Sequence, residues 1–142
     1  MIPGVNTMYF SDKVLIVEGK TDKRRIEEVL IEPVQIICTH GTMGISKLDE
    51  ILDQLNGSDI YILSDADKEG KNIRKWFKKH LSESTHIYID PKFGEVGRCP
   101  RDYLANLLMR HDFYVDTSLI MKGKFSNDER TKDNRYYQPY SI

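Results

Sequence analysis

The chain has 142 residues, which suits one domain with a genuine core and excludes two domains of full size. Its formal net charge of −1 excludes a uniformly basic surface, so any binding to nucleic acid must depend on a local patch or on a metal ion. No segment approaches the about 20 apolar residues of a membrane span and the two cysteines form no C-x-x-C pair, so we expect a cytoplasmic protein without a membrane contact, a disulfide or a zinc site.

The first half of the chain predicts an alternation of strands and helices. Residues 13–18 form a short apolar run that ends in Glu18, as expected of a parallel strand that is covered on both faces. Apolar residues recur at helical spacing over residues 23–31, and Thr21 is the expected N-cap of this helix. We next expect a strand over residues 34–38 and a Gly-bearing loop over residues 39–44. A helix over about residues 46–55 follows this loop.

The second half continues this alternation. A third strand over residues 59–63 leads directly into the acidic loop 64–70, whose sequence is Ser-Asp-Ala-Asp-Lys-Glu-Gly. After this loop we expect a helix over residues 70–81 and a fourth strand over residues 85–90, which ends in an acid. A closing helix over residues 100–109 follows. Trp76 shares the apolar face of the first of these helices, so we expect it in the core.

This order of elements predicts an α/β protein with a central, mostly parallel four-stranded sheet, helices on both faces and right-handed crossovers. We expect the folded domain to span residues 11–112. Residues 113–142 then form a C-terminal extension or tail, in which residues 113–121 have the pattern of one more strand and residues 122–142 are polar, with several tyrosines and no periodicity.

Acidic side chains follow the strands of the predicted sheet. The carboxyl ends of parallel strands meet at one edge, which brings Glu18, Asp65 and Asp67 together. Clustered carboxylates repel one another unless they hold a cation or share protons, and hard oxygen ligands of this kind suit Mg²⁺ or Mn²⁺. The same crowding raises the proton affinity of Glu18, which suits it to proton transfer. Asp90 ends the fourth strand at this edge and either lies near the metal or begins a turn before Pro91.

Two segments of the sequence resemble the signature motifs of a known family. Residues 17–22 (Val-Glu-Gly-Lys-Thr-Asp) and 65–70 (Asp-Ala-Asp-Lys-Glu-Gly) resemble those of the Toprim family, which includes topoisomerases of types IA and II, bacterial primases, recombination and old-family nucleases and the 5S ribosomal RNA maturases. The resemblance covers about residues 13–109, and the continuation over residues 70–75 is most similar to the maturases.

The resemblance implies a Toprim fold and a set of catalytic residues. By analogy with the family, Asp65 and Asp67 bind Mg²⁺ or Mn²⁺, and Glu18 acts as a ligand or as a general acid/base. Such a metal binds a phosphate oxygen, polarises the phosphorus and stabilises the leaving oxygen.

Several polar residues near this edge are candidate contacts to phosphate. Lys20 either contacts phosphate or is a solvated loop lysine, and a P-loop is excluded because Val14 stands where its first Gly is required. His40 and Gly41 either place an imidazole and a backbone N–H near a phosphate or form a surface turn. Arg98 either contacts phosphate or caps the closing helix.

The helix after the acidic loop has a basic side opposite its apolar face. This basic stripe either follows a phosphate backbone or is only a solvated face, and it contains Lys71, Arg74, Lys75, Lys78 and Lys79. Lys68, within the acidic loop, is a further candidate contact to phosphate or nucleic acid.

Three functions fit these features. The first is a Mg²⁺-dependent phosphoryl-transfer enzyme acting on phosphodiesters of RNA or DNA, similar to a maturase or another nuclease of the family. The second is a metal- and nucleic-acid-binding adaptor that needs a protein partner, because the about thirty weakly patterned residues after residue 112 are too few for a second core. The third is a nucleotide phosphohydrolase or nucleotidyl transferase that uses the same edge of the sheet.

Overall fold

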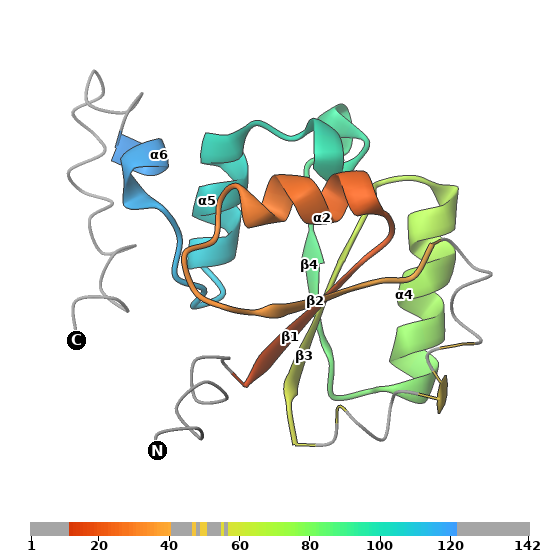
Figure 1. The fold of residues 1–142 in the computed structure, drawn as a ribbon. Coiled ribbons are helices and arrows are strands. Elements are labelled where there is room, and N and C mark those ends of the chain that lie inside the picture. Colours follow the sequence, from red (N-terminus) through yellow and green to blue (C-terminus); the bar gives the residue numbers. More distant parts are fainter. Residues whose placement is uncertain (1–11, 41–46, 48, 51–54, 56, 122–142) are drawn as a thin grey trace, which may run out of the picture.

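A four-stranded sheet forms the centre of the protein (Figure 1). The computed structural model describes residues 12–40, 47, 49–50, 55 and 57–121. The strands lie in the order β2-β1-β3-β4, and each neighbouring pair is parallel. Their bounds are β1 (Lys13–Val17), β2 (Gln35–Cys38), β3 (Asp59–Ser64) and β4 (Thr85–Tyr88). The predicted sheet is therefore confirmed, and it is parallel throughout.

Helices cover both faces of this sheet. Helix α4 (Lys68–His80) lies on one face, and α2 (Lys20–Glu27) and α5 (Arg101–Met109) lie on the other (Figure 1). Two short 3₁₀ helices, η2 (Pro91–Phe93) and η3 (Val96–Arg98), connect β4 to α5, and α6 (Thr117–Met121) follows α5. The three layers confirm the predicted α/β architecture.

Successive residues of each strand point to opposite faces of the sheet. Their side chains therefore belong to two separate hydrophobic cores, one on each face. On the α4 side, Val14 and Ile16 of β1 pack with Ile73 and Phe77 of the helix. Trp76 is half-buried and packs against this core, as predicted, with its ring edge-on to Phe77.

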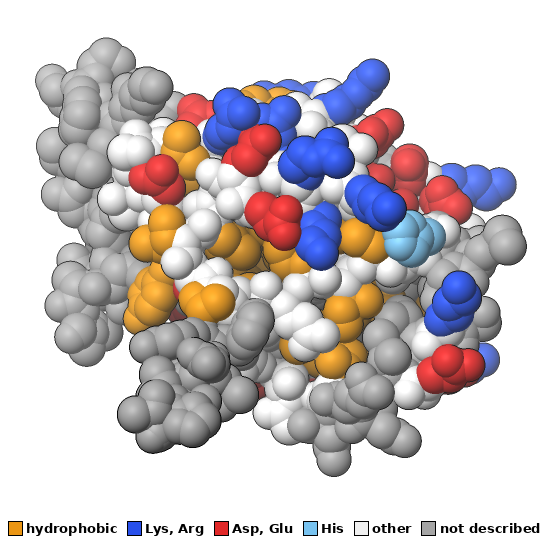
Figure 2. Space-filling view, in the orientation of Figure 1, with side chains coloured by type: hydrophobic (Ala, Val, Ile, Leu, Met, Phe, Trp, Pro, Cys, Tyr) orange, Lys and Arg blue, Asp and Glu red, His pale blue; other side chains and the backbone are white. Residues whose placement is uncertain are grey.

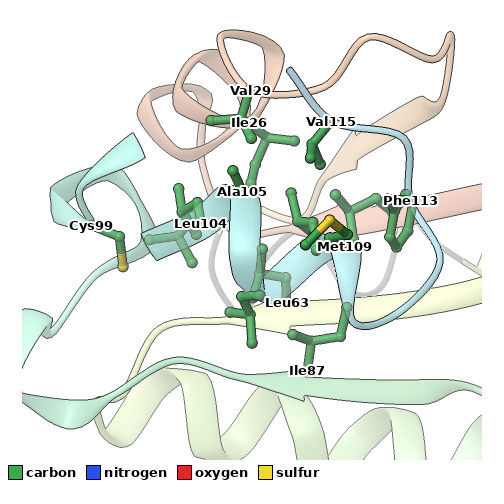
Figure 3. Close-up of a cluster of buried hydrophobic side chains, with 14 of the residues drawn as sticks. Ile26, Val29, Leu63, Ile87, Cys99, Leu104, Ala105, Met109, Phe113 and Val115 are labelled. Atoms are coloured by element: carbon green, nitrogen blue, oxygen red, sulfur yellow. The ribbon is translucent and has the colours of Figure 1, made fainter. Parts of the chain in front are cut away.

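The core on the opposite face is larger. Ile26 and Val29 meet Leu104 and Met109 of α5 above Leu63 of β3 (Figure 3). The same cluster includes the buried residues Phe113, Val115 and Ile120 that follow α5. This packing holds α2 and the turns before α5 firmly over the carboxyl ends of the strands.

The N-terminal boundary of α2 differs from the prediction. The helix begins at Lys20 with Gly19 as its N-cap, so the expectation of Thr21 as N-cap was wrong. The backbone N–H of Gly19 donates to Asp22 Oδ2 at 3.2 Å, which stabilises the first turn without a side chain at the cap position. The helix also ends at Glu27, because Leu30 leaves it to form an isolated antiparallel bridge with Val115.

The prediction of another strand over residues 113–121 was wrong. Among the described residues Val115 pairs with Leu30 alone, in this isolated bridge, and α6 begins two residues later. Asp116 accepts the backbone N–H of Ser118 at 3.0 Å, which favours a helix start at this point. Strand β4 likewise ends at Tyr88 rather than at residue 90.

Some predictions fall outside the described residues. These are most of the helix expected over residues 46–55, the loop residue Gly41 and the tail over residues 122–142. Within the part of the chain that the structure describes, every helix is too short or too polar to cross a bilayer.

Candidate metal centre

Three carboxylates converge at the carboxyl edge of the sheet. Glu18 directly follows β1, Asp65 directly follows β3, and Asp67 is the N-cap of α4. Strands β1 and β3 are neighbours in register, with Ile16 opposite Ile62, so their ends lie side by side. One carboxylate oxygen from each of the three residues lies within 4.8 Å of the others.

Each of these carboxylates is oriented by one backbone N–H group. Glu18 Oε2 accepts the N–H of Asp65 at 2.8 Å, which ties the two strand ends together. Asp65 Oδ1 accepts the N–H of Val96 at 2.7 Å, and Asp67 Oδ1 accepts that of Gly70 at 2.7 Å. The second oxygen of each carboxylate receives no hydrogen bond from a described residue, so each carboxylate has an oxygen to offer to a cation.

Gly70 makes the close packing of the acidic loop feasible. A Cβ atom at this position would lie only 2.0 Å from the carbonyl oxygen of Asp65. The first turn of α4 therefore rests directly on the backbone of the loop, and any other residue would push the two apart. This contact gives a physical reason for the Gly three residues after Asp67.

A fourth acid, Asp22, completes the floor of the site. It is 5% exposed and accepts the N–H groups of Gly19 and, at 2.8 Å, of Gly97 in η3. Asp22 thus joins the start of α2 to the segment that orients Asp65. The sequence prediction did not include Asp22, although its position three residues after Gly19 is a signal of N-terminal capping.

Burial and mutual repulsion raise the proton affinity of the cluster. The pKa of Glu18 rises to about 7, mainly because the side chain is buried, with further increases from the charges of Asp65, Asp67 and Asp22. Burial also raises the pKa of Asp65 to about 6 and that of Asp22 above its ordinary value. Without a compensating cation these groups are held in proximity at an electrostatic cost.

The residues present fit a hard divalent cation. The cluster lies in an open hollow of about 430 Å³ whose acidic lining residues are Glu18, Asp22, Asp65, Asp67, Glu69 and Glu95. The other lining residues that the structure describes are Gly19, Thr21 and His40, so no Lys or Arg neutralises the cluster from this lining. Oriented carboxylates with free oxygens are the donors that Mg²⁺ and Mn²⁺ prefer.

A second hollow lies on the other side of the acidic loop and shares Asp67 with the first. Its volume is about 540 Å³, and Lys68, Lys71 and Arg74 of α4 line it together with Tyr88 at the end of β4. Arg74 also donates to Ser64 Oγ at 2.7 Å and to the carbonyl oxygen of Asp65 at 3.2 Å. The basic stripe predicted on α4 is thus divided, since Lys75, Lys78 and Lys79 are exposed outside the lining of either hollow.

The other residues that the sequence offered as contacts to phosphate or metal do not gather at one place. His40 lines the acidic hollow, with φ of 55°, and its N–H donates to the carbonyl oxygen of Glu18 at 2.6 Å. Lys20 and Arg98 are both exposed and line neither hollow. Asp90 is exposed and accepts the N–H of Lys92 at 3.0 Å, which is the turn that the sequence offered as one alternative.

Charged side chains of both signs gather on the face of the molecule that Figure 2 draws. In Figure 2, lysines, arginines and acidic residues are interspersed over α2 and towards the carboxyl ends of the strands, whereas hydrophobic side chains show mainly below α2. This face is therefore strongly polar but of mixed sign.

A parallel α/β sheet with carboxylates gathered at its carboxyl edge defines an α/β protein with a candidate divalent-metal site. The Toprim domain profile matches residues 13–95, and the chain belongs to this family. Toprim domains generally bind nucleic acid, and many carry out Mg²⁺-dependent phosphoryl transfer. The resemblance noted from the two sequence motifs is thereby confirmed.

Individual relatives agree with this assignment. A Bacillus subtilis (strain 168) protein, YusF, described as uncharacterized, is 45% identical over 109 residues, which cover 77% of this chain and 75% of YusF. The structure of a small TOPRIM domain protein from Bacillus stearothermophilus matches with a TM-score of 0.73 and 42% identity, over 80% of this chain and 96% of that one.

More distant similarity extends to proteins named Ribonuclease M5. The protein from Borreliella burgdorferi is 34% identical over 100 residues, or 68% of this chain and 54% of the relative. The protein from Mycoplasma genitalium is 28% identical over 80 residues, or 56% of this chain and 44% of the relative. The chain therefore spans about half the length of these two ribonucleases.

Proposed function

We propose that this protein catalyses Mg²⁺- or Mn²⁺-dependent phosphoryl transfer at phosphodiesters of nucleic acid, with strand cleavage as its reaction. The observation that carries the proposal is the convergence of Glu18, Asp65 and Asp67 within 4.8 Å, each with one oxygen oriented by a backbone N–H. The similarity to proteins named Ribonuclease M5 supports a nucleic-acid substrate.

Asp65, Asp67 and Glu18 would hold the metal through the oxygens that accept no backbone N–H. Such a cation supplies positive charge next to a phosphate oxygen, which polarises the phosphorus and stabilises the leaving oxygen. Val96 and Gly70 keep the carboxylates of Asp65 and Asp67 in place, so these ligands need little rearrangement when charge develops.

Glu18 has the second role of handling a proton. Its Oε2 atom is held by the N–H of Asp65, so Oε1 is the atom that either binds the metal or, when Asp65 and Asp67 hold the metal without it, accepts or delivers the proton. Burial brings the pKa of this carboxyl to about 7 in the metal-free site, and an adjacent cation lowers it again. A group whose pKa is adjusted in this range is suited to general acid or base catalysis near neutral pH.

Cleavage assays with isosteric variants test this proposal. Structured RNA and DNA are incubated with the protein in Mg²⁺ or Mn²⁺, and the fragments are followed by gel electrophoresis. We expect cleavage by the wild type and a loss of at least about a hundredfold in Asp65→Asn and Glu18→Gln, because each variant removes a ligand charge but keeps the shape.

Two matched variants control for the substitutions themselves. Asp59→Asn alters an exposed acid at the opposite end of β3, and Glu83→Gln alters an exposed acid between α4 and β4. Neither residue lines the acidic hollow. Both should cleave like the wild type. Cleavage that persists in Asp65→Asn would overturn the proposal, as would metal-dependent binding of nucleic acid without any cleavage, which is the behaviour of an adaptor. Hydrolysis of free nucleotides alone would support the nucleotide-specific alternative instead.

A further inference from the structure

The hollow on the α4 side of Asp67 is lined by both apolar and cationic side chains. Tyr88, Ala66, Ile89 and Pro91 contribute its apolar surface, and the cations come from one face of α4. Its volume of about 540 Å³ lies in the range of pockets that bind small organic groups, about 300–1,000 Å³. An aromatic ring and apolar side chains beside cations are complementary to a nucleotide, which has a flat base and an anionic phosphate.

The three cations are positioned by helical spacing. Lys68, Lys71 and Arg74 follow one another at intervals of three residues, so they lie along one side of α4 facing the hollow. Arg74 is held in place by Ser64 and by the backbone of Asp65. The arginine that borders the hollow is therefore fixed to the same loop that carries the metal ligands.

Tyr88 is unusual among the large side chains of the sheet. It is 52% exposed, although it lies at the end of a strand, and among the described strands β4 is an edge strand that pairs with β3 alone. The guanidinium of Arg74 lies 5.1 Å from the centre of its ring, which supports the ring from the side of α4. An exposed, supported aromatic ring next to lysines is a stacking surface for a base.

We propose that this hollow binds one unpaired nucleotide of the substrate strand, adjoining the phosphate at the metal site, with its base on Tyr88 and its backbone along Lys68, Lys71 and Arg74. The inference rests on the proposed function, because Asp67 lines both hollows and would place this nucleotide next to the reacting phosphate. The substrate class is then a single strand or a loop, since a base inside a continuous duplex has both faces covered by its neighbours.

A binding experiment tests this inference without depending on cleavage. An oligonucleotide of about ten residues, short enough to resemble one single-strand binding site, carries one 2-aminopurine, whose fluorescence reports base stacking. It is titrated with the wild type, Tyr88→Leu and Tyr88→Phe in Ca²⁺, first as a single strand and then as a blunt duplex, in RNA and DNA versions. Thermal unfolding of each variant verifies that it is folded, as expected for an exposed edge residue.

We expect Tyr88→Leu to weaken single-strand binding about 5- to 150-fold and to abolish the fluorescence change, since stacking on an aromatic ring is worth about 1–3 kcal/mol per base. Tyr88→Phe keeps the ring and should bind like the wild type. Lys75→Ala removes an exposed cation of α4 outside the hollow and should change affinity less than about twofold. RNA and DNA arms decide which strand the hollow prefers.

Two results would overturn the inference: equal loss of single-strand and duplex affinity in Tyr88→Leu, or no loss at all. Both are distinguishable from failure of the proposed function. If Asp65→Asn abolishes cleavage while Tyr88→Leu binds normally, only the nucleotide site is refuted. If Tyr88→Leu loses single-strand binding but the wild type never cleaves, the site stands and the catalytic proposal fails.

Discussion

The two hollows on either side of Asp67 differ in almost every property except position. One is lined by six acids and no described Lys or Arg, and the other by three cations, an aromatic ring and apolar side chains. Both are built on the same loop between β3 and α4. One short segment thus separates an acidic hollow from a basic one. Asp65 lines the acidic hollow, Asp67 lines both, and the helix that Asp67 caps presents its cations to the basic hollow.

The largest effect on this arrangement should come from Gly70→Ala. The added Cβ would lie 2.0 Å from the carbonyl oxygen of Asp65, so α4 must move away from the loop and both hollows lose their common wall. We expect a decrease of about 3 kcal/mol or more in the free energy of unfolding, measured by urea denaturation.

Gly19→Ala is the matched control for this variant. Gly19 precedes α2 with φ of −140°, and a Cβ there meets no atom within 4 Å. Its free energy of unfolding should change by less than about 1 kcal/mol. Equal destabilisation in the two variants would mean that the contact between Gly70 and the loop is not what fixes the acidic loop.

The acidic hollow should also show itself in the pH dependence of stability. In the folded, metal-free protein the pKa of Glu18 is about 7 and that of Asp65 about 6, against ordinary values of 4.5 and 3.8. At a pH between the ordinary pKa of each carboxyl and its raised pKa in the folded protein, the folded protein binds more protons than the unfolded chain. Stability is therefore greatest below this window and falls as the pH rises through it to above 7, by at most about 6 kcal/mol for the two carboxyls together.

Mg²⁺ should reverse this trend because it binds the deprotonated carboxylates. Its addition should raise the melting temperature strongly at about pH 8 and little at about pH 5, where protons compete. Differential scanning fluorimetry at each pH measures the effect. Glu18→Gln should flatten the pH dependence of the metal-free protein, and a wild type that became more stable with rising pH without metal would contradict the raised pKa values of Glu18 and Asp65.

The sheet and the clustering of Glu18, Asp65 and Asp67 could be predicted from the sequence for a local reason. Apolar runs that end in Glu18 or in the 64–70 loop place acids at strand ends, and parallel strands then bring those acids together. Asp22 and the supporting N–H of Val96 were not predicted, because their contacts join residues 31 to 75 positions apart. Only the folding of η3 against both α2 and the acidic loop brings these groups together.

Other features were missed because tertiary packing overrides a local pattern. Thr21 has the chemistry of an N-cap, yet the turn is already closed by Asp22 on Gly19. The apolar alternation over 113–121 suggested a strand, but Phe113 and Val115 instead fill a core beside α5. The exposure of Tyr88 depends on its place at the sheet edge, which periodicity does not report.

A smaller effect is expected from Asp22→Asn, which removes one charge from the acidic hollow. Asp22 is among the charges that raise the pKa of Glu18 and is the foremost of those that raise the pKa of Asp65. Its neutralisation should lower both pKa values by less than about one unit, which corresponds to about 1 kcal/mol or less each. Carboxyl ¹³C chemical shifts followed through a pH titration of the metal-free protein measure this, and Asp59→Asn, outside the cluster, should leave both titrations unchanged.

The smallest effect concerns the salt dependence of the basic hollow. Lys71→Ala removes one of its three cations, so single-strand affinity at low salt should fall only about threefold to tenfold, and the slope of log affinity against log salt should decrease by about 0.7. Lys75→Ala, one turn further along α4 but outside the hollow, should retain the wild-type slope. Identical slopes for the two variants would mean that the strand follows the outer face of α4 generally. A difference between them would instead locate the phosphate path in the hollow beside Asp67, where three cations, the ring of Tyr88 and the acidic loop lie together.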